Sequence, residues 1–281
     1  AHVFTLGSGF QYLNAVDVDN DGKDDIVKVN HAGISALSTT LRITVMSPVT
    51  SGSSNIPSRT FDVEVNGTIN IDGNLSPMQR TYNIGDYLGN GYKQLLTTSS
   101  CIKPVTGETM TSWTSLIDLN SGVELSEEHL YQLSMNDKEL CVDLDGDGRT
   151  ELCHIGTAGM KTYNMEGSRM VLTGTHTLPT GPLLERGFHI ADFNGDGYAD
   201  FLIEPASSTD SWTACLYTGH EFHSIQLQLS GKEESDRFMF FDLNKDGLSD
   251  LVRENSGSLY IYINDRCSLS AATAVTSSVT V

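Results

Sequence analysis

The sequence predicts an all-β protein, a β-propeller built from four-stranded antiparallel blades, and three observations carry this prediction. A short acidic loop recurs five times along the 281 residues, at intervals of 49 to 69 residues, which suits a propeller blade better than a helical hairpin. Short apolar runs rich in β-branched and aromatic residues flank the loops, as strands do. No convincing amphipathic helix is present, and the nearest candidate covers residues 124–133.

The five loops share one spacing of side chains. Positions 1, 3, 5 and 9 of a complete loop carry side-chain oxygens, and position 6 is always glycine. The complete copies are loop 1 (residues 17–25), loop 3 (143–151), loop 4 (192–200) and loop 5 (242–250). Loop 2 (86–94) keeps the glycine and loses most of the acids. Each loop therefore marks one of five recognisable units.

Strands are expected on both sides of the loops and between them. The runs before a complete loop are 13–16, 140–142, 189–191 and 238–241, and those after it are 26–29, 152–155, 201–203 and 251–252. Further candidates are 41–46, 61–65, 212–217 and 259–263, and residues 41–73 form a longer Ser/Thr/Gly-rich excursion in the first unit. Units of this kind leave no exposed edges when they are arranged radially. We expect the propeller to span residues 1–267, with 268–281 as a closing strand or a linker tail.

Each complete loop is predicted to bind one Ca²⁺ ion, about four in all. Alternate residues of a tight loop turn their oxygens inward, glycine at position 6 takes a backbone geometry that other residues resist, and the carbonyl of position 7 is a further expected ligand. Three or four carboxylates suit Ca²⁺ better than Mg²⁺, and Zn²⁺ or Cu²⁺ would need His or Cys. The predicted ligands are Asp17, Asp19, Asp21, Lys23 and Asp25; Asp143, Asp145, Asp147, Arg149 and Glu151; Asp192, Asn194, Asp196, Tyr198 and Asp200; and Asp242, Asn244, Asp246, Leu248 and Asp250.

The second half of the loop separates this pattern from an EF-hand. An EF-hand needs a bidentate Glu at position 12 and a helix on each side. Position 12 here is Lys28, His154, Ile203 or Arg253, and an apolar strand begins at position 10. The acid stands at position 9 instead, so the pattern indicates a calcium loop in a β-hairpin. Loop 2 has Leu88 at position 3 and Gln94 at position 9, and it is predicted to be a metal-free turn.

The composition of the chain limits the classes of binding partner that are expected. Acidic residues outnumber basic ones 36 to 17, and the formal charge of −19 argues against nucleic acid and anionic membrane. No run of 18 apolar residues is present, so no membrane insertion is expected. The chain begins at Ala1 with no start Met and no basic-then-apolar leader, as expected of a mature or excised piece. The five cysteines include no C-x-x-C pair, and Cys141 and Cys153, on either side of loop 3, could form a cross-strand disulfide or remain buried thiols.

The acidic motif resembles a known family. Repeated Asp-x-Asp/Asn-x-Asp-Gly-x-x-Asp before an apolar strand is similar to the FG-GAP or VCBS repeat of integrin-α-like β-propellers, and residues 216–222 resemble that family's later hairpin. The resemblance is specific at the four complete loops and covers roughly residues 10–265. It implies calcium loops on one face of a propeller, and five units where members often have seven imply a small propeller or part of a larger ring. In bacteria such repeats often sit in large secreted or surface proteins, including the region upstream of Rhs-type repeats in toxin complexes.

The leading hypothesis for function is a non-catalytic, calcium-stabilised scaffold or protein-binding module of a secreted or cell-surface protein. Loops of this type in extracellular proteins work at roughly 10⁻⁴ to 10⁻³ M Ca²⁺, a level that the cytosol does not supply. No nucleophile motif, P-loop or dinucleotide fingerprint is present, and residues 220–223 lack the spacing of a zinc protease, so that they indicate a solvated hairpin turn.

Two alternative hypotheses involve carbohydrate. One is a carbohydrate-binding, lectin-like propeller, in which Trp113, Trp212, Tyr87 or Tyr198 stacks on a sugar, although packing between blades is the competing role of these aromatic residues. The other is an accessory domain of a polysaccharide-degrading enzyme, with the catalytic domain elsewhere. Reproducible glycan binding that is lost on Trp212→Ala would favour the lectin.

Overall fold

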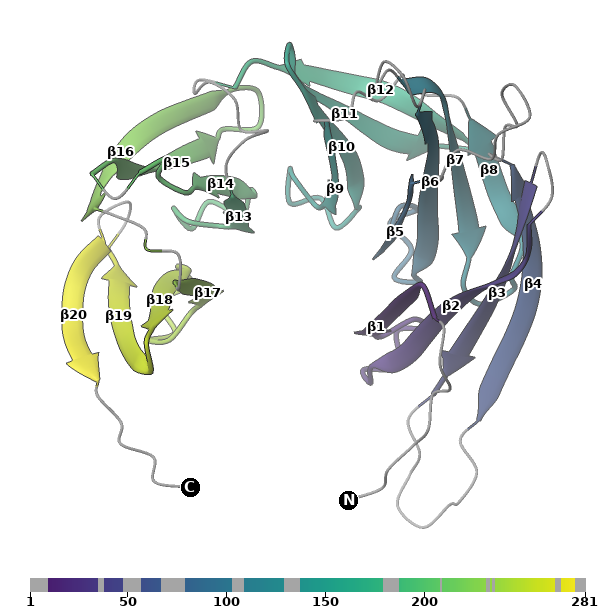
Figure 1. Cartoon of the computed structure of the whole chain (residues 1–281), viewed down its shortest axis with the longest axis horizontal. Coiled ribbons are helices and arrows are strands. Elements are labelled where there is room, and N and C mark those ends of the chain that lie inside the picture. The colour runs from purple at the N-terminus through teal and green to yellow at the C-terminus, as the bar shows by residue number, and fades with distance from the viewer. Residues whose placement is uncertain are drawn as a thin grey trace. The chain divides into compact units, whose positions relative to one another are not determined.

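A computed structural model describes residues 10–34, 38–47, 57–66, 79–102, 109–128, 137–178, 187–207, 209–230, 233, 236–265 and 269–275. These residues contain twenty strands and no helix, and hence no helix that could cross a membrane. The strands form five four-stranded sheets, each with its strands in chain order across the sheet (Figure 1). The fold is therefore all-β, with five sheets of the size and order expected of propeller blades, which confirms the predicted class.

Each sheet is a meander of consecutive strands. The first contains β1 (Tyr12–Val16), β2 (Asp25–Ile34), β3 (Ser38–Met46) and β4 (Ser58–Asn66). The second contains β5 (Gln79–Gly85), β6 (Gln94–Ile102), β7 (Thr109–Asp118) and β8 (Glu124–Glu128), and the third β9 (Lys138–Val142), β10 (Glu151–Gly156), β11 (Gly159–Glu166) and β12 (Arg169–His176). The fourth contains β13 (Phe188–Ala191), β14 (Asp200–Ile203), β15 (Ser211–Tyr217) and β16 (Phe222–Ser230), and the fifth β17 (Arg237–Phe241), β18 (Asp250–Asn255), β19 (Ser258–Asn264) and β20 (Leu269–Val275).

The structure corrects or refines the expectations for three segments. The nearest helix candidate was wrong over its first half, because 124–128 is strand β8, paired antiparallel with β7, and 129–133 lies outside the described residues. A free sheet edge outweighs the weak helix preference of this Glu-rich segment. The excursion over 41–73 contains most of β3 and all of β4, the third and fourth strands of the first sheet, while 48–56 and 67–73 are not described. Within 268–281, residues 269–275 form the outer strand of the fifth sheet.

The chain divides into two compact units. Unit 1 comprises Ala1–Cys141, Gly148–Leu152 and Tyr163–Thr173, and unit 2 comprises Val142–Asp147, Cys153–Thr162 and Gly174–Val281. The first two sheets thus belong to unit 1, the last two belong to unit 2, and the third contributes to both.

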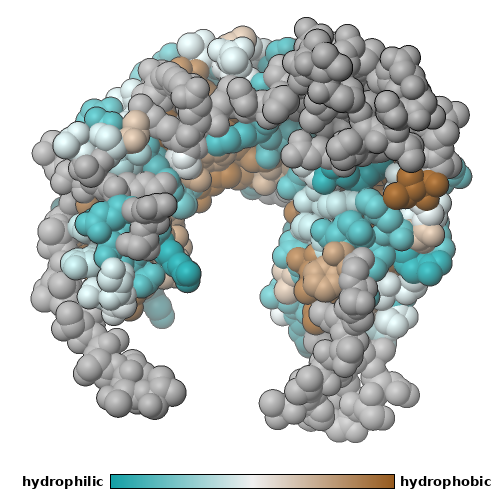
Figure 2. Space-filling view, viewed as in Figure 1, coloured by the Kyte–Doolittle hydropathy of each residue, from teal (hydrophilic) through white to brown (hydrophobic). Residues whose placement is uncertain are grey.

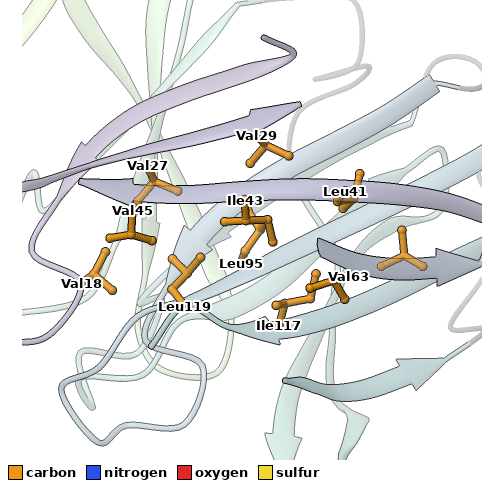
Figure 3. Close-up of a cluster of buried hydrophobic side chains, with 11 residues drawn as sticks. Val18, Val27, Val29, Leu41, Ile43, Val45, Val63, Leu95, Ile117 and Leu119 are labelled. Atoms are coloured by element: carbon orange, nitrogen blue, oxygen red, sulfur yellow. The ribbon is translucent and has the colours of Figure 1, made fainter. Parts of the chain in front are cut away.

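Alternating side chains build the core of unit 1. Along β2 and β3, residues such as Val27, Val29 and Ile43 are fully buried, while their neighbours in sequence are partly or fully exposed, which is the period of two of a strand with one buried face. These side chains meet Leu95 and Ile117 of the second sheet in one hydrophobic cluster (Figure 3). The first and second sheets therefore pack face to face through branched aliphatic side chains.

Unit 2 has an aromatic core of its own. Phe193 and Trp212 are fully buried, and Phe238 and Phe240 of β17 pack against the same cluster. The rings of Trp212 and Phe238 lie edge to face with centroids 4.7 Å apart, a favourable geometry for aromatic pairs. Both units thus bury an inter-sheet face, and each presents its loops from a packed scaffold.

The described surface is mixed in character. Figure 2 shows hydrophilic side chains over much of the visible face, interrupted by smaller hydrophobic patches. Several large hydrophobic side chains are exposed, among them Ile34, Val123, Leu172, Phe241 and Tyr92. Single exposed apolar residues are ordinary on protein surfaces.

Candidate metal centre

All five acidic loops join the first strand of a sheet to its second strand. Position 6 of every loop is a glycine with φ between 83° and 88°, in the left-handed region that other residues avoid. Position 4 is left-handed as well, with φ from 61° to 77°, and the residues there are Asn20, Gly89, Gly146, Gly195 and Lys245. The recurring glycine thus has the backbone role that the sequence predicts.

The carboxylate at position 1 holds the loop backbone. Asp17 accepts hydrogen bonds from the backbone N–H groups of Asp21 and Gly22, at 3.1 and 2.9 Å. Asp242 repeats both bonds with Asp246 and Gly247. These charge-assisted bonds tie the start of each loop to its middle and so hold the turn closed.

Position 3 and position 5 bring further oxygens to the same place in loop 1. Carboxylate oxygens of Asp17, Asp19 and Asp21 lie within 4.8 Å of one another. In loop 3, carboxylate oxygens of Asp143, Asp145 and Glu151 also lie within 4.8 Å of one another. Burial and the nearby charges of Asp147 and Asp143 raise the pKa of Asp145, so these carboxylates repel one another unless a cation compensates.

Loops 4 and 5 replace the middle acid by an amide. Asn194 Oδ1 accepts the N–H of Asp196 at 2.9 Å, while its Nδ2 donates to Asp196 Oδ2 at 2.9 Å. Asn244 and Asp246 form the equivalent pair in loop 5. An amide that satisfies one carboxylate lowers the repulsion in the loop, and its oxygen remains a ligand type that Ca²⁺ accepts.

Position 9 has a structural role that the sequence did not reveal. Asp200 is fully buried, and its two oxygens accept the backbone N–H groups of Phe193, at 2.9 Å, and Tyr217, at 2.8 Å. Asp250 makes the same two bonds, to Leu243 and Asn264. The acid therefore fastens its loop to the third strand of the sheet, whether or not it also binds a cation.

Burial disfavours the charged form of Asp200, the position 9 acid of loop 4. Burial raises the pKa of Asp200 to about 6, against the opposing effect of its two backbone hydrogen bonds. A cation in the loop would favour the ionised form and draw this pKa down again. Asp25, 1% exposed, accepts the N–H of Val18 in the same way.

Loop 2 keeps the hairpin with a different set of bonds. Asp86 accepts the N–H groups of Asn90 and Gly91, as position 1 does elsewhere. Gln94 Oε1 accepts the N–H of Tyr87 at 2.8 Å, and Gln94 Nε2 donates to the carbonyl of Tyr92 at 2.8 Å. The amide of Gln94 thus replaces one of the two backbone bonds of the position 9 acid without its charge. That loop 2 is a metal-free turn stays a prediction, made from the loss of acids at positions 3 and 9.

Successive loops also contact each other within each unit. In unit 1 and in unit 2, the N–H of position 8 donates to the carbonyl of position 1 or 2 of the preceding loop. The four bonds are Lys93 to Val18 (3.0 Å), Thr150 to Asp86 (2.8 Å), Ala199 to Leu144 (3.0 Å) and Ser249 to Asp192 (3.4 Å). The loops therefore link neighbouring sheets, which the spacing of the repeat did not predict.

Two of the aromatic residues considered for stacking on sugars prove to be core residues. Trp212 and Tyr87 are fully buried, so the expectation that they could stack on a ligand was wrong. Tyr198 is half-buried and lies against Tyr217, with ring centroids 5.9 Å apart. Large aromatic side chains fill space between sheets at low cost in side-chain entropy, which explains their positions. His220 and His223 are exposed at the β15–β16 hairpin, as the solvated-turn interpretation expects.

The cysteines near loop 3 are thiols. Cys141 and Cys153 form no disulfide, and neither does the buried Cys215. Burial raises the pKa of Cys141 to about 12. The side chains of Cys101 and Cys267 lie outside the described part of the chain.

We expect these buried thiols to resist alkylation in the folded protein. Iodoacetamide at neutral pH should modify the peptides that contain Cys153 and Cys215 only after denaturation, because a thiolate must be exposed to react. Peptide mass spectrometry of native and denatured samples measures this directly. Modification of both peptides at equal rates before and after denaturation would contradict the burial described above.

The repeat also matches a family model. Residues 143–203 match the model of the FG-GAP-like repeat, a segment that runs from the start of loop 3 to the end of the strand after loop 4. The chain contains an FG-GAP-like repeat. The resemblance read from the acidic loops is confirmed in this segment. The FG-GAP-like repeat here includes two complete acidic loops, which places both within the family pattern.

Two solved structures align with this chain at low sequence identity, and the first of them shares its fold. An Agrocybe aegerita lectin, described as recognising non-reducing terminal N-acetylglucosamine, aligns over 94% of this chain with 16% identity and a TM-score of 0.63. A Photorhabdus luminescens Tc holotoxin pore aligns over 95% of it with 14% identity and a TM-score of 0.48. The chain spans 65% of the lectin chain and 12% of the holotoxin chain. No curated protein sequence matches it.

Proposed function

We propose that this protein is a non-catalytic, calcium-stabilised β-propeller that serves as a scaffold or protein-binding module of a secreted or cell-surface protein. The observation that carries the proposal is the convergence of Asp17, Asp19 and Asp21 in loop 1, repeated by the acids of loop 3. Side-chain oxygens gathered on a tight glycine-containing loop are the ligand set that Ca²⁺ prefers. The FG-GAP-like match over loops 3 and 4 supports the same assignment.

The placement of the loops supports a stabilising role for the cations. Each loop closes the first hairpin of a sheet, and the loops are hydrogen-bonded to one another within each unit. A cation that draws the loop carboxylates together would stabilise the hairpin and the contact with the next sheet at once. The ligands of the four sites are the residues at positions 1, 3, 5 and 9, with the carbonyl of position 7.

The proposal extends to location and partners. Sites of this kind fill at the calcium concentrations found outside cells. Each unit presents its loops from sheets that pack through a buried core, an arrangement that suits a protein-binding module. The first test of this part is capture of a specific protein partner by the calcium-loaded chain.

We expect four Ca²⁺ ions for each chain after dialysis against 1 mM Ca²⁺ and removal of unbound ions. Elemental analysis gives the count. Asp21→Ala removes a position 5 carboxylate from loop 1 and should lower the count to three. The matched control is Asn90→Ala, the same position in loop 2, which should leave four.

Two results would contradict these assignments. A count that is the same for the parent chain and for Asp21→Ala would mean that loop 1 holds no ion. A count that falls on Asn90→Ala would mean that loop 2 holds one, against the prediction of a metal-free turn.

A further inference from the structure

Alternate residues of loop 2 line a pocket. Its volume is about 380 Å³, near the lower end of the range for small-molecule sites. The loop contributes positions 3, 5, 7 and 9, which are Leu88, Asn90, Tyr92 and Gln94. The β7–β8 hairpin supplies the rest of the lining, Asp118, Asn120 and Leu125. Four of the seven lining residues therefore occupy the positions that the other loops are predicted to use for a cation.

We propose that this pocket binds one uncharged sugar unit. The proposal rests on the chemistry of the lining and does not depend on calcium in the other loops. Leu88 and Leu125 give the pocket apolar surface, and Tyr92, which is 46% exposed, lines it beside them. Aromatic and aliphatic surface can pack against the C–H face of a sugar ring, which is apolar although the ring edge is polar.

The polar groups of the lining are oriented by bonds within the protein. Arg59 Nη2 donates to Asn120 Oδ1 at 2.9 Å, so the Nδ2 group of Asn120 is the one that a ligand oxygen can accept from. Asn90 Oδ1 accepts the N–H of Tyr92 at 3.0 Å, which likewise leaves its Nδ2 group as a donor. Because these side chains are oriented before binding, the free-energy cost of ordering them when a ligand binds is small.

One acceptor complements the two donors. The Asp118 carboxylate accepts the N–H of Asn120 at 2.9 Å and the hydroxyl of Ser121 at 2.7 Å, and a carboxylate has further lone pairs for a ligand hydroxyl. It is the charged side chain of the lining, so the pocket disfavours phosphate or carboxylate ligands. A ligand with several hydroxyl groups and no charge matches two amide donors and one carboxylate acceptor.

Loop 2 is also held in shape without a cation. Gln94 ties Tyr87 to Tyr92 through its two amide atoms, and Asp86 holds the backbone at Asn90. The loop has thus exchanged a charged ligand set for an apolar and amide-lined one while keeping its geometry. A neutral organic ligand suits an apolar and amide lining, whereas a cation does not.

The test uses the whole chain in 1 mM Ca²⁺ with methyl glycosides of glucose, galactose, mannose, N-acetylglucosamine and N-acetylgalactosamine as probes. Saturation-transfer NMR identifies a binder, and titration gives its affinity. We expect at least one sugar to bind with a Kd of about 1 mM or below. Tyr92→Ala and Asn120→Ala should each weaken that binding by about tenfold, as expected for loss of one good contact worth about 1.4 kcal/mol.

The matched control is Phe241→Ala, which removes another exposed aromatic side chain, one that lies outside the pocket. It should leave the sugar affinity unchanged. Tyr92 is exposed, so its replacement should preserve the fold, and melting curves of all variants verify this. The proposal is overturned by the absence of binding for every probe at about 10 mM, by equal binding to Tyr92→Ala and the parent chain, or by a cation bound at loop 2. None of these results alters the ion count expected for the other loops, so the two proposals fail separately.

Discussion

The melting temperature is expected to fall by about 10 °C when 1 mM Ca²⁺ is replaced by excess chelator. A site with a Kd near 10⁻⁴ M contributes about 1.4 kcal/mol at that calcium concentration. Four such sites together contribute about 5 kcal/mol, comparable with the net stability of many domains. A chain of this length loses a few degrees for each kcal/mol. Calorimetry or circular dichroism in the two buffers measures the difference.

The effect of calcium binding on the melting temperature must be separated from the effect of ionic screening of the carboxylates. Clustered carboxylates such as Asp17, Asp19 and Asp21 also repel less at high ionic strength, because salt screens exposed charges. The control is therefore chelator with added NaCl at matched ionic strength, which should recover little of the lost stability. An unchanged melting temperature in a sample shown to be metal-free would overturn the calcium proposal.

The sheets and their loops could be predicted from the sequence because both are local features. The apolar runs 26–29 and 238–241 each stand next to a glycine-containing loop. The first lies in the strand after loop 1, and the second lies in the strand before loop 5. A strand of β-branched residues beside a turn depends mainly on its own sequence. The family match over 143–203 confirms the same pattern independently.

Features that depend on distant partners could not be predicted in this way. Strand β8 forms because it can pair with the edge of β7. The Glu-rich sequence of 124–128 alone does not predict this pairing. Trp212 looks like a ligand-stacking residue in isolation, yet it is enclosed by Phe238 and other side chains of the fifth sheet. Burial is a property of the packed sheets, so composition alone cannot separate a core aromatic residue from an exposed one.

The pocket beside loop 2 is a further case. Its loop half follows a spacing that is visible in the sequence, from Leu88 to Gln94, but its other half comes from the β7–β8 hairpin. The hydrogen bonds between consecutive loops are equally hidden, because backbone groups make them. Sequence patterns indicated where the loops lie, and the strand pairings decide what each loop faces.

The acid at position 9 gives the sharpest test of the difference between holding a cation and holding the fold. We expect Asp200→Ala to lower the free energy of unfolding by about 2–6 kcal/mol both with calcium and with chelator. The change leaves the N–H groups of Phe193 and Tyr217 without their acceptors in a buried place, and each such group costs about 1–3 kcal/mol. Denaturant titration in the two buffers measures both values.

The matched variant is Asn194→Ala, at position 3 of the same loop. Among the described residues its side chain is hydrogen-bonded to Asp196 of the same loop, so its loss should matter mainly when calcium is present. Asp200→Gln copies the residue that loop 2 carries at this position, where Gln94 accepts the N–H of Tyr87. It should recover part of the stability that Asp200→Ala loses in chelator, because one buried N–H regains an acceptor without a charge. If Asp200→Ala destabilised the protein only in calcium, position 9 would act purely as a cation ligand, and the two backbone bonds would contribute nothing measurable.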